Sequence, residues 1–225
     1  MTLPTSSRRR GCIDVWVIAA TMLLAAIAGD ITQTEPIDSK AEEVIARTRT
    51  IASTYTIYWR VRIAGNSLEP EYAWGATFRR GALLRVEDLR SRAVADCSSG
   101  TGTQYYHSVG RNDYSVGRKI AERYCGIDAD RKIRSTRWLG QKDSKFGLVD
   151  ELRVVDEDGT FTYQVTAAGE VVGVTSVFRG STVAVVAEPM SFEHNVPAGD
   201  LFTRTSLATS KVSRAIQSQG SRAGR

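Results

Sequence analysis

An alternation of apolar and polar residues that begins at Tyr55 constrains the fold of this chain more than any other feature. From Tyr55 to Ile63 every second residue is apolar. A period of two is typical of a β-strand with one buried face. The same pattern returns, between turn residues, in residues 72–78, 84–86, 146–155, 161–166, 171–178 and 182–187. No helical stretch of about 10 to 15 residues separates the four later strands, so crossover connections are not expected and the predicted sheet is antiparallel.

A helix is predicted directly before the first strand. Ser39 and Glu42 form the S-x-x-E pattern of a capping box, in which the two side chains satisfy amides of the first turn. An apolar stripe at helical spacing follows, made of Ala41, Val44, Ile45, Thr48, Ile51 and Ala52. This helix should pack on an apolar surface. Residues 116–126 fit either a strand or a short helix.

These elements predict a mainly β (α+β) fold, namely a single curved antiparallel sheet or half-barrel with the N-terminal helix packed on its concave face. A closed barrel and a sandwich stay open as alternatives, because periodicity does not distinguish them. One face of the sheet is expected to carry the large apolar side chains, which are Trp59, Trp74, Phe78, Phe161 and Tyr163. One short helix would cover that face incompletely.

The 225 residues divide into a leader, one domain and a tail. Residues 1–28 are predicted to be a signal peptide, residues 29–204 the antiparallel half-barrel domain, and residues 205–225 a weakly helical to disordered tail. The end of this tail is rich in Ser, Gly and Arg, a composition that cannot bury much apolar surface.

The leader has the three parts of a secretory signal. Arg8, Arg9 and Arg10 precede an apolar run that ends in Ala26-Ile27-Ala28, an A-x-A cleavage site. The run of residues 15–28 would span about 21 Å as a helix, less than the about 30 Å of a bilayer core. Cleavage near Ala28 is therefore favoured over a retained anchor. The mature protein is expected to be exported to the periplasm, with peripheral or no membrane contact.

The charge balance is mild. Thirty Lys and Arg against 25 Asp and Glu give +5, and cleavage near Ala28 would remove three basic residues and one acidic residue, leaving +3. Nucleic acid is not an expected partner of an exported chain with this charge. The arginines of one cluster are interpreted as a charged solvent face; they are Arg79, Arg80, Arg85, Arg90 and Arg92.

Two cysteines, Cys97 and Cys125, remain after the predicted cleavage. In an oxidising compartment such a pair is expected to form a structural disulfide. The alternative, a redox pair, lacks the C-x-x-C spacing of that chemistry.

The sequence offers little equipment for catalysis. Neither G-x-S-x-G nor S-x-x-K occurs after residue 28, and H-E-x-x-H is missing. With His107 and His194 as the two histidines, no metal site, cofactor or catalytic residue is predicted. Carboxylates at 87–88 and 150–151 are interpreted as solvated strand faces, and those at 156–158 as turn residues, although a catalytic pair assembled by folding is the competing hypothesis.

The order of elements in residues 39–204 resembles that of the periplasmic lipoprotein carriers and receptors of the LolA/LolB superfamily. The segment 72–85 is similar to the long second and third strands of that family, and Val94-Ala95-Asp96 with Gln104-Tyr105-Tyr106 is similar to its "valine, aspartate, glycine, then an aromatic strand" segment. Residues 196–202 resemble its C-terminal part. The resemblance implies an unclosed antiparallel barrel that holds acyl chains in an apolar cavity, without cofactor or catalysis.

The function expected from these observations is that of a non-enzymatic carrier or binding protein with an acyl-chain or lipoprotein ligand. Its predicted lining residues are Trp59, Val61, Trp74, Phe78 and Phe161. The alternative is a structural envelope protein that binds a protein partner through its basic face or a sheet edge.

Overall fold

The computed structural model describes residues 37–64, 71–88, 91–108, 111–127 and 132–212. The predicted signal peptide and its cleavage site lie outside these residues, as do residues 213–225 of the predicted tail. Among the described residues, no helix is both long and apolar enough to span a bilayer.

An 11-stranded antiparallel sheet makes up most of the described chain. The elements in chain order are α2 (Ser39–Arg49), β1 (Thr54–Ala64), β2 (Glu71–Arg80), β3 (Leu83–Glu87), β4 (Ser91–Asp96), β5 (Thr101–Ser108), β6 (Arg111–Gly117), α3 (Arg118–Tyr124), β7 (Ser135–Ser144), β8 (Gly147–Val155), β9 (Gly159–Thr166), β10 (Val171–Phe178), β11 (Ala184–Glu193) and the 3₁₀ turn η1 (Thr205–Ala208).

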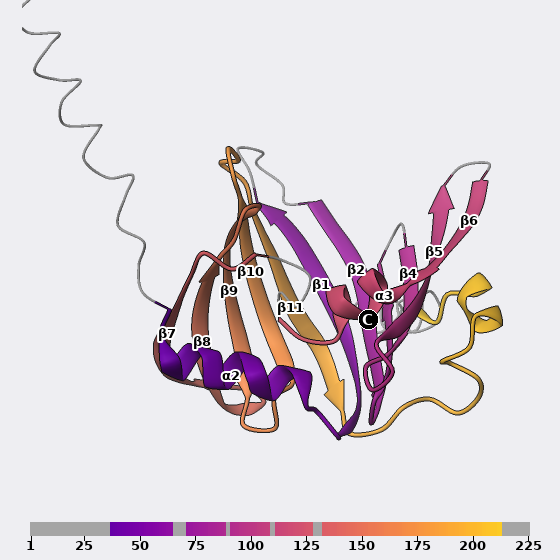
Figure 1. Cartoon of the computed structure of the whole chain (residues 1–225), viewed down its shortest axis with the longest axis horizontal. Helices are drawn as coiled ribbons and strands as arrows, with labels where there is room; N and C mark the ends of the chain where they lie inside the picture. Colours follow the sequence, from indigo (N-terminus) through magenta and orange to yellow (C-terminus); the bar gives the residue numbers. More distant parts are fainter. Residues whose placement is uncertain (1–36, 65–70, 89–90, 109–110, 128–131, 213–225) are drawn as a thin grey trace, which may run out of the picture. The chain divides into compact units, whose positions relative to one another are not determined.

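The sheet consists of two meanders that meet at its centre. Strands β1 to β6 follow one another to one edge, strands β11 to β7 follow one another to the other edge, and β1 pairs with β11. Figure 1 shows the sheet curving around α2 and α3. We call the face toward these helices the inner face and the opposite one the outer face. The predicted fold, a single curved antiparallel sheet with the N-terminal helix on its concave side, is confirmed.

Helix α2 begins at Ser39, but Asp38 caps it. The Asp38 carboxylate accepts hydrogen bonds from the backbone amides of Lys40 (2.8 Å) and Ala41 (3.3 Å). Its other oxygen accepts the amide of Trp138 in β7 (2.9 Å). The capping box predicted at Ser39 is wrong, because the chain is already held against β7 at Asp38 and this side chain reaches both the helix and the sheet.

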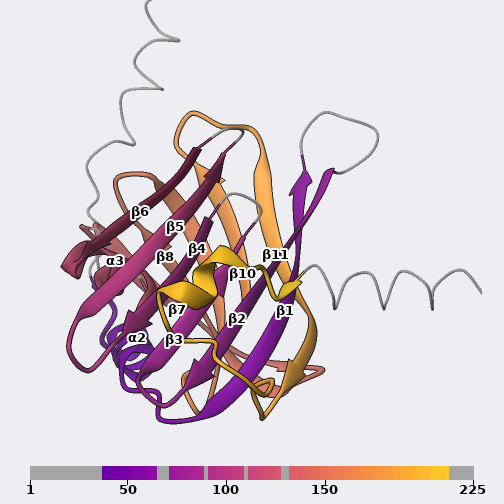
Figure 2. The same ribbon diagram turned by 90° about the vertical axis from the view of Figure 1, so that its right-hand side faces the viewer.

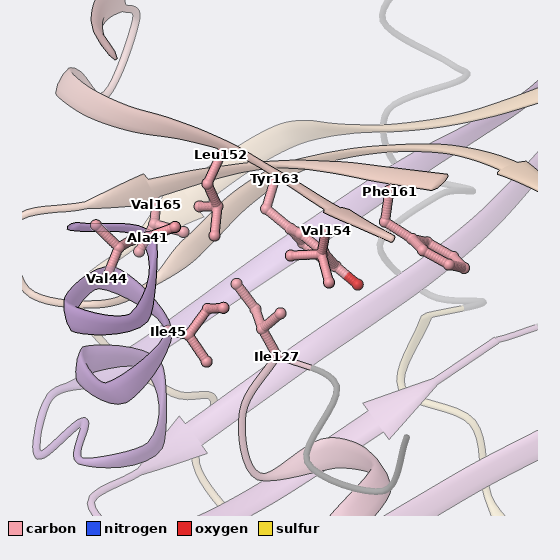
Figure 3. Close-up of a cluster of buried hydrophobic side chains, with 9 residues drawn as sticks. All are labelled: Ala41, Val44, Ile45, Ile127, Leu152, Val154, Phe161, Tyr163 and Val165. Carbon is pink, nitrogen blue, oxygen red and sulfur yellow. The ribbon is translucent and has the colours of Figure 1, made fainter. Parts of the chain in front are cut away.

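The predicted apolar stripe of α2 packs on the inner face (Figure 3). The helix contributes Ala41, Val44 and Ile45, which are at most 4% exposed. The sheet side of the same cluster consists of Leu152, Val154, Phe161, Tyr163 and Val165. This cluster is the core of the β7–β10 half.

The segment 116–126 contains both structures that its sequence allows, since β6 ends at Gly117 and α3 follows. α3 packs on β4 and β5. Gly102 in β5 permits this close approach, because a Cβ there would lie 2.7 Å from Cγ2 of Ile120. The helix ends at Cys125, which is bonded to Cys97 in the β4–β5 turn. The predicted disulfide is confirmed, and it fastens α3 to the sheet.

Residues 201–212, here called the C-terminal strap, cross the outer face over β2 to β5 (Figure 2). Leu201 and Val212 pack against Phe78, and Leu207 packs against Val94 and Tyr105. The packed domain therefore extends to Val212, and residues 205–212 belong to it.

The apolar residues of β1 and β2 lie on opposite faces. Residues directly opposite in an antiparallel pair share a face. Trp59 is opposite Gly75, and Tyr55 is opposite Arg79, which leaves Trp74 and Phe78 on the outer face. The expectation that Trp59, Trp74 and Phe78 share one face is wrong, because the strap gives the outer face of β2 an apolar cover of its own.

Candidate functional site

A cavity of about 390 Å³ lies between the inner face and the helices that cover it. Its walls come from β1, β2, β3, β9 and β10, from the end of α2, and from the end of α3 with the residues after it. Trp59, Tyr163 and Val174 are among the apolar and aromatic groups that line it. Its volume lies at the lower end of the range for small-molecule sites, roughly 300–1,000 Å³.

The end of α2 meets the residues that follow α3 beside the cavity. The Thr48 hydroxyl of α2 donates to the Ile45 carbonyl (2.7 Å) and accepts the backbone amide of Ile127 (3.0 Å). Gly126 has a φ of +145°, and a Cβ there would lie 2.5 Å from Cγ of Arg49. A glycine is therefore required where the chain after α3 passes over the end of α2.

Trp59 is held in the wall by a side-chain hydrogen bond. Its Nε1 donates to the Thr77 hydroxyl of β2 (2.9 Å), and both residues line the cavity. The indole is thus oriented by a polar bond at one edge while its rings face the cavity, as suits a half-buried tryptophan.

One part of the cavity wall is polar and positively charged. Arg79 is 2% exposed and donates to the carbonyls of Gly81 (Nε, 2.9 Å) and Ile51 (Nη2, 3.2 Å). Beside it, burial raises the pKa of the Tyr55 hydroxyl to about 12, although the Arg79 charge acts in the opposite direction. Tyr55 is therefore a neutral hydroxyl at physiological pH.

Another network fastens α2 beside the cavity. Asp150 of β8 accepts hydrogen bonds from the Arg47 guanidinium and from Nε1 of Trp138 (3.1 Å). Burial alone raises the pKa of Asp150, but these two bonds and the Arg47 charge outweigh it, so the pKa lies below its usual value. The predicted solvated face at residue 150 is wrong, because this carboxylate is 3% exposed and anchors a helix.

The five predicted lining residues lie in different places. Trp59 lines the cavity, and Phe161 lies in the adjoining cluster, where its ring stacks on Tyr163 at 6.3 Å. Val61 follows Trp59 on the same strand and is half-buried. Trp74 and Phe78 pack under the C-terminal strap instead.

Sequence reasoning misses most of the wall. The missed lining residues lie at polar positions of a strand or at the ends of helices, and they include Arg79 in β2, Thr48 near the end of α2, and Tyr124 and Ile127 at and after the end of α3. The available signal is the alternation in β2, where Thr77 and Arg79 alternate with the apolar residues; knowledge of the β1–β2 register would place them on the inner face.

The described arginines of the cluster do not form one solvent face, so that interpretation is wrong for them; Arg90 lies outside the described residues. Arg79 is buried on the inner face, whereas Arg85 is 0% exposed under the strap on the outer face. Arg80 is exposed and lies over the Phe202 ring at 5.4 Å. Successive side chains of a strand point to opposite faces of the sheet, so arginines that are close in the sequence lie on different faces.

Two further candidate groups, Asp156 and His194, have structural contacts, and the side chain of His107 lies outside the described part of the chain. Asp156 accepts the amides of Asp158 (2.7 Å) and Gly159 (2.9 Å), which confirms turn chemistry there. His194 is exposed and contacts the Phe192 ring at 4.8 Å. Within the described ranges, no cluster of three His, Cys, Asp or Glu is arranged to hold a metal ion.

A second hollow, of about 410 Å³, has a different character. It is lined by Arg60, Lys145 and Glu188 among others. Arg60 and Glu188 form an ion pair at 2.9 Å, and Lys145 donates to the Pro189 carbonyl at 2.6 Å. Its charged lining is paired within itself, so we take the cavity under α2 and α3 as the candidate site.

No family model matches this sequence, and no curated protein sequence matches it either. Solved structures that resemble it include an uncharacterized conserved protein from Thermus thermophilus, with a TM-score of 0.49 and 11% identity over 76% of this chain and 94% of that one. MucB gives a TM-score of 0.42 and 12% identity over 79% of this chain and 65% of MucB. A LolA superfamily protein from Nitrosomonas europaea gives 0.40 and 8%, over 74% and 99% of the two chains. These are similarities to solved structures, each with a TM-score below 0.5 and an identity of 12% or less.

Proposed function

We propose that this protein is a non-enzymatic binding or carrier protein of the periplasm that holds an apolar ligand, such as an acyl chain, in the cavity under α2 and α3. The observation that carries this proposal is the cavity itself, about 390 Å³ of space lined by aromatic and aliphatic groups on the inner face of the sheet. An acyl chain would gain about 0.8 kcal/mol for each methylene group removed from water.

The cover favours reversible binding. α3 has seven residues, and its N-cap, Gly117, offers no side chain to cap it. Short helices of this kind depend on tertiary contacts for their stability. Since the disulfide keeps Cys125 at the β4–β5 turn, small movements of α3 within that limit would open the cavity without disturbing the sheet.

Export is proposed on two grounds. Residues 1–28 have the pattern of a cleaved signal peptide. The disulfide between Cys97 and Cys125 is the kind of bond that forms and persists in an oxidising compartment such as the periplasm.

The proposal is tested by native mass spectrometry and by the fluorescence of an acyl-chain probe. We expect co-purified apolar ligand and a saturable probe response. Val174→Phe fills the cavity and should weaken probe binding at least about tenfold. Val186→Phe is the matched control, because Val186 pairs with Thr175 and faces the outer side. No co-purified ligand together with no probe response would refute the proposal.

The alternative, a structural envelope protein, is favoured by a different observation. Edge strand β6 has an unpaired side, and Tyr114 and Val116 on it are 37% and 67% exposed. Open strand edges bind extended peptides by strand addition. Ser115→Pro should then abolish capture of the protein partner, while the response of the acyl-chain probe stays intact.

A further inference from the structure

Arg79 of β2 and Arg85 of β3 are both almost fully buried, but their guanidinium groups have different partners. Arg85, on the outer face, donates to the Glu87 carboxylate at 2.7 Å, so its charge is neutralised. Arg47, at the end of α2, is paired with Asp150. Arg79, on the inner face, has only backbone carbonyls and the Tyr55 hydroxyl as partners among the described residues.

The charge of Arg79 is therefore uncompensated at close range. No described carboxylate oxygen lies within 4.0 Å of its guanidinium. The buried carboxylate nearby, Glu170, accepts hydrogen bonds from the hydroxyls of Ser53 (2.9 Å) and Thr166 instead. A buried cation is costly unless it is paired, and five N–H donors in a rigid fork suit a carboxylate or phosphate.

The cavity lining has the same sign of charge throughout. Its described residues include two arginines, Arg79 and Arg123, and no Asp or Glu. Arg123 is exposed, so the buried Arg79 is the charge that acts on a bound group at a low effective dielectric constant.

The volume limits the size of the ligand. At about 390 Å³ the cavity has between two and three times the volume of an engineered site of about 150 Å³ that holds one benzene. One flexible chain fits such a space, whereas the several chains of a multiply acylated lipid do not.

We infer that the cavity selects a single-chain amphiphile with an anionic head, a carboxylate or a phosphate, and that Arg79 is the residue that binds this head while the chain lies against Trp59, Tyr163 and Val174. This inference rests on the proposed function, since it names the ligand class of the same cavity.

The test measures the affinity of the purified protein for five ligands below their micellar concentrations. Four carry the same twelve-carbon chain: dodecanoate, dodecyl phosphate, dodecanol and dodecyltrimethylammonium. The fifth is the short anion acetate. We expect the anionic amphiphiles to bind at least about tenfold more tightly than dodecanol, the cation to bind most weakly, and acetate not to bind. Whichever anion binds better identifies carboxylate or phosphate as the preferred head.

Substitutions assign the effect to a residue. Arg79→Gln should reduce the anionic preference, which is the ratio of the affinities for dodecanoate and dodecanol, to about twofold or less. Arg80→Gln is the neighbouring control and should leave the preference intact. Because Arg79 also supports the backbone, the ligand series on the unsubstituted protein is repeated at high salt. A buried contact is little screened, so the preference should persist.

The outcomes separate the two claims. Equal affinity for all four amphiphiles overturns this inference and leaves the proposed function standing. A preference that disappears at high salt, or that survives Arg79→Gln, also overturns it. If no amphiphile binds at all, the proposed function fails, and this inference with it.

Discussion

Asp38 connects helix and sheet through one side chain. It caps α2 and also accepts the Trp138 amide of β7. Asp38→Ala should lower the midpoint of thermal unfolding by about 2–6 °C, since both contacts are lost. Ser39→Ala is the matched control and should have an effect of less than about 1 °C. Equal effects of the two substitutions on the unfolding midpoint would instead support the capping box at Ser39 that the sequence predicts.

Asp96 makes the β4–β5 turn sensitive to acid. Hydrogen bonds from the Ser98 side chain and from the amides of Ser98 and Ser99 lower its pKa from 3.8 to about 2. The stability that this carboxylate contributes is complete above pH 3.8 and is lost as the pH falls through about 2. The midpoint of thermal unfolding should therefore be higher for the unsubstituted protein than for Asp96→Asn at pH 6, and this difference should shrink toward pH 2. A difference independent of pH would contradict this account.

At the scale of elements, the C-terminal strap depends on a buried ion pair. Arg85 donates to the carbonyls of Leu201 (2.9 Å) and Thr209 (2.8 Å), and Glu87 accepts the Ser210 hydroxyl (2.8 Å). Arg85→Ala leaves Glu87 buried without its partner, which should cost about 3–5 kcal/mol in urea unfolding. Arg80→Ala, at an exposed position, should cost less than about 1 kcal/mol. A comparable small loss for both would mean that the strap does not depend on the pair.

The elements that the sequence predicts well are those with a buried, periodic pattern. Residues 171–178 are predicted as a strand and form β10 with the same bounds. Strand β7 is missed, because its sequence contains Arg137, Lys142 and Asp143 at an edge where many side chains face solvent. Polar edge strands lack the hydrophobic alternation by which strands are recognised.

At the scale of the whole molecule, one covalent bond holds the α3 side of the cover. The loop between Cys97 and Cys125 has a separation of 28 residues, for which the chain-entropy estimate is about 3.5 kcal/mol. A variant with Ser at both positions should lose about that much free energy of unfolding and should match the reduced unsubstituted protein. A variant as stable as the oxidised protein would show that packing alone holds α3.

The site is less predictable than the fold, because it depends on register between segments far apart in sequence. Trp59 is identified by alternation within its own strand. Arg79 is not, since its face is decided by its pairing with Tyr55, and Ile127 is not, since it reaches the cavity through the hydrogen bond to Thr48. Strand register and the contact between α2 and the residues after α3 are tertiary contacts, and the local sequence carries no pattern that predicts them.

The central claim is that an apolar chain occupies the cavity on the inner face, and the tryptophans test it directly. Trp59 lines the cavity, whereas Trp74 lies on the outer face and Trp138 contacts Asp150. Two variants of the protein starting at Gly29 are compared. One retains Trp59 as its single tryptophan and the other retains Trp74, and the other two tryptophan positions carry Phe in each. Titration with a chain-brominated twelve-carbon fatty acid should quench Trp59 strongly and saturably and should leave Trp74 unquenched. Equal quenching of both, or none of Trp59, would contradict the account.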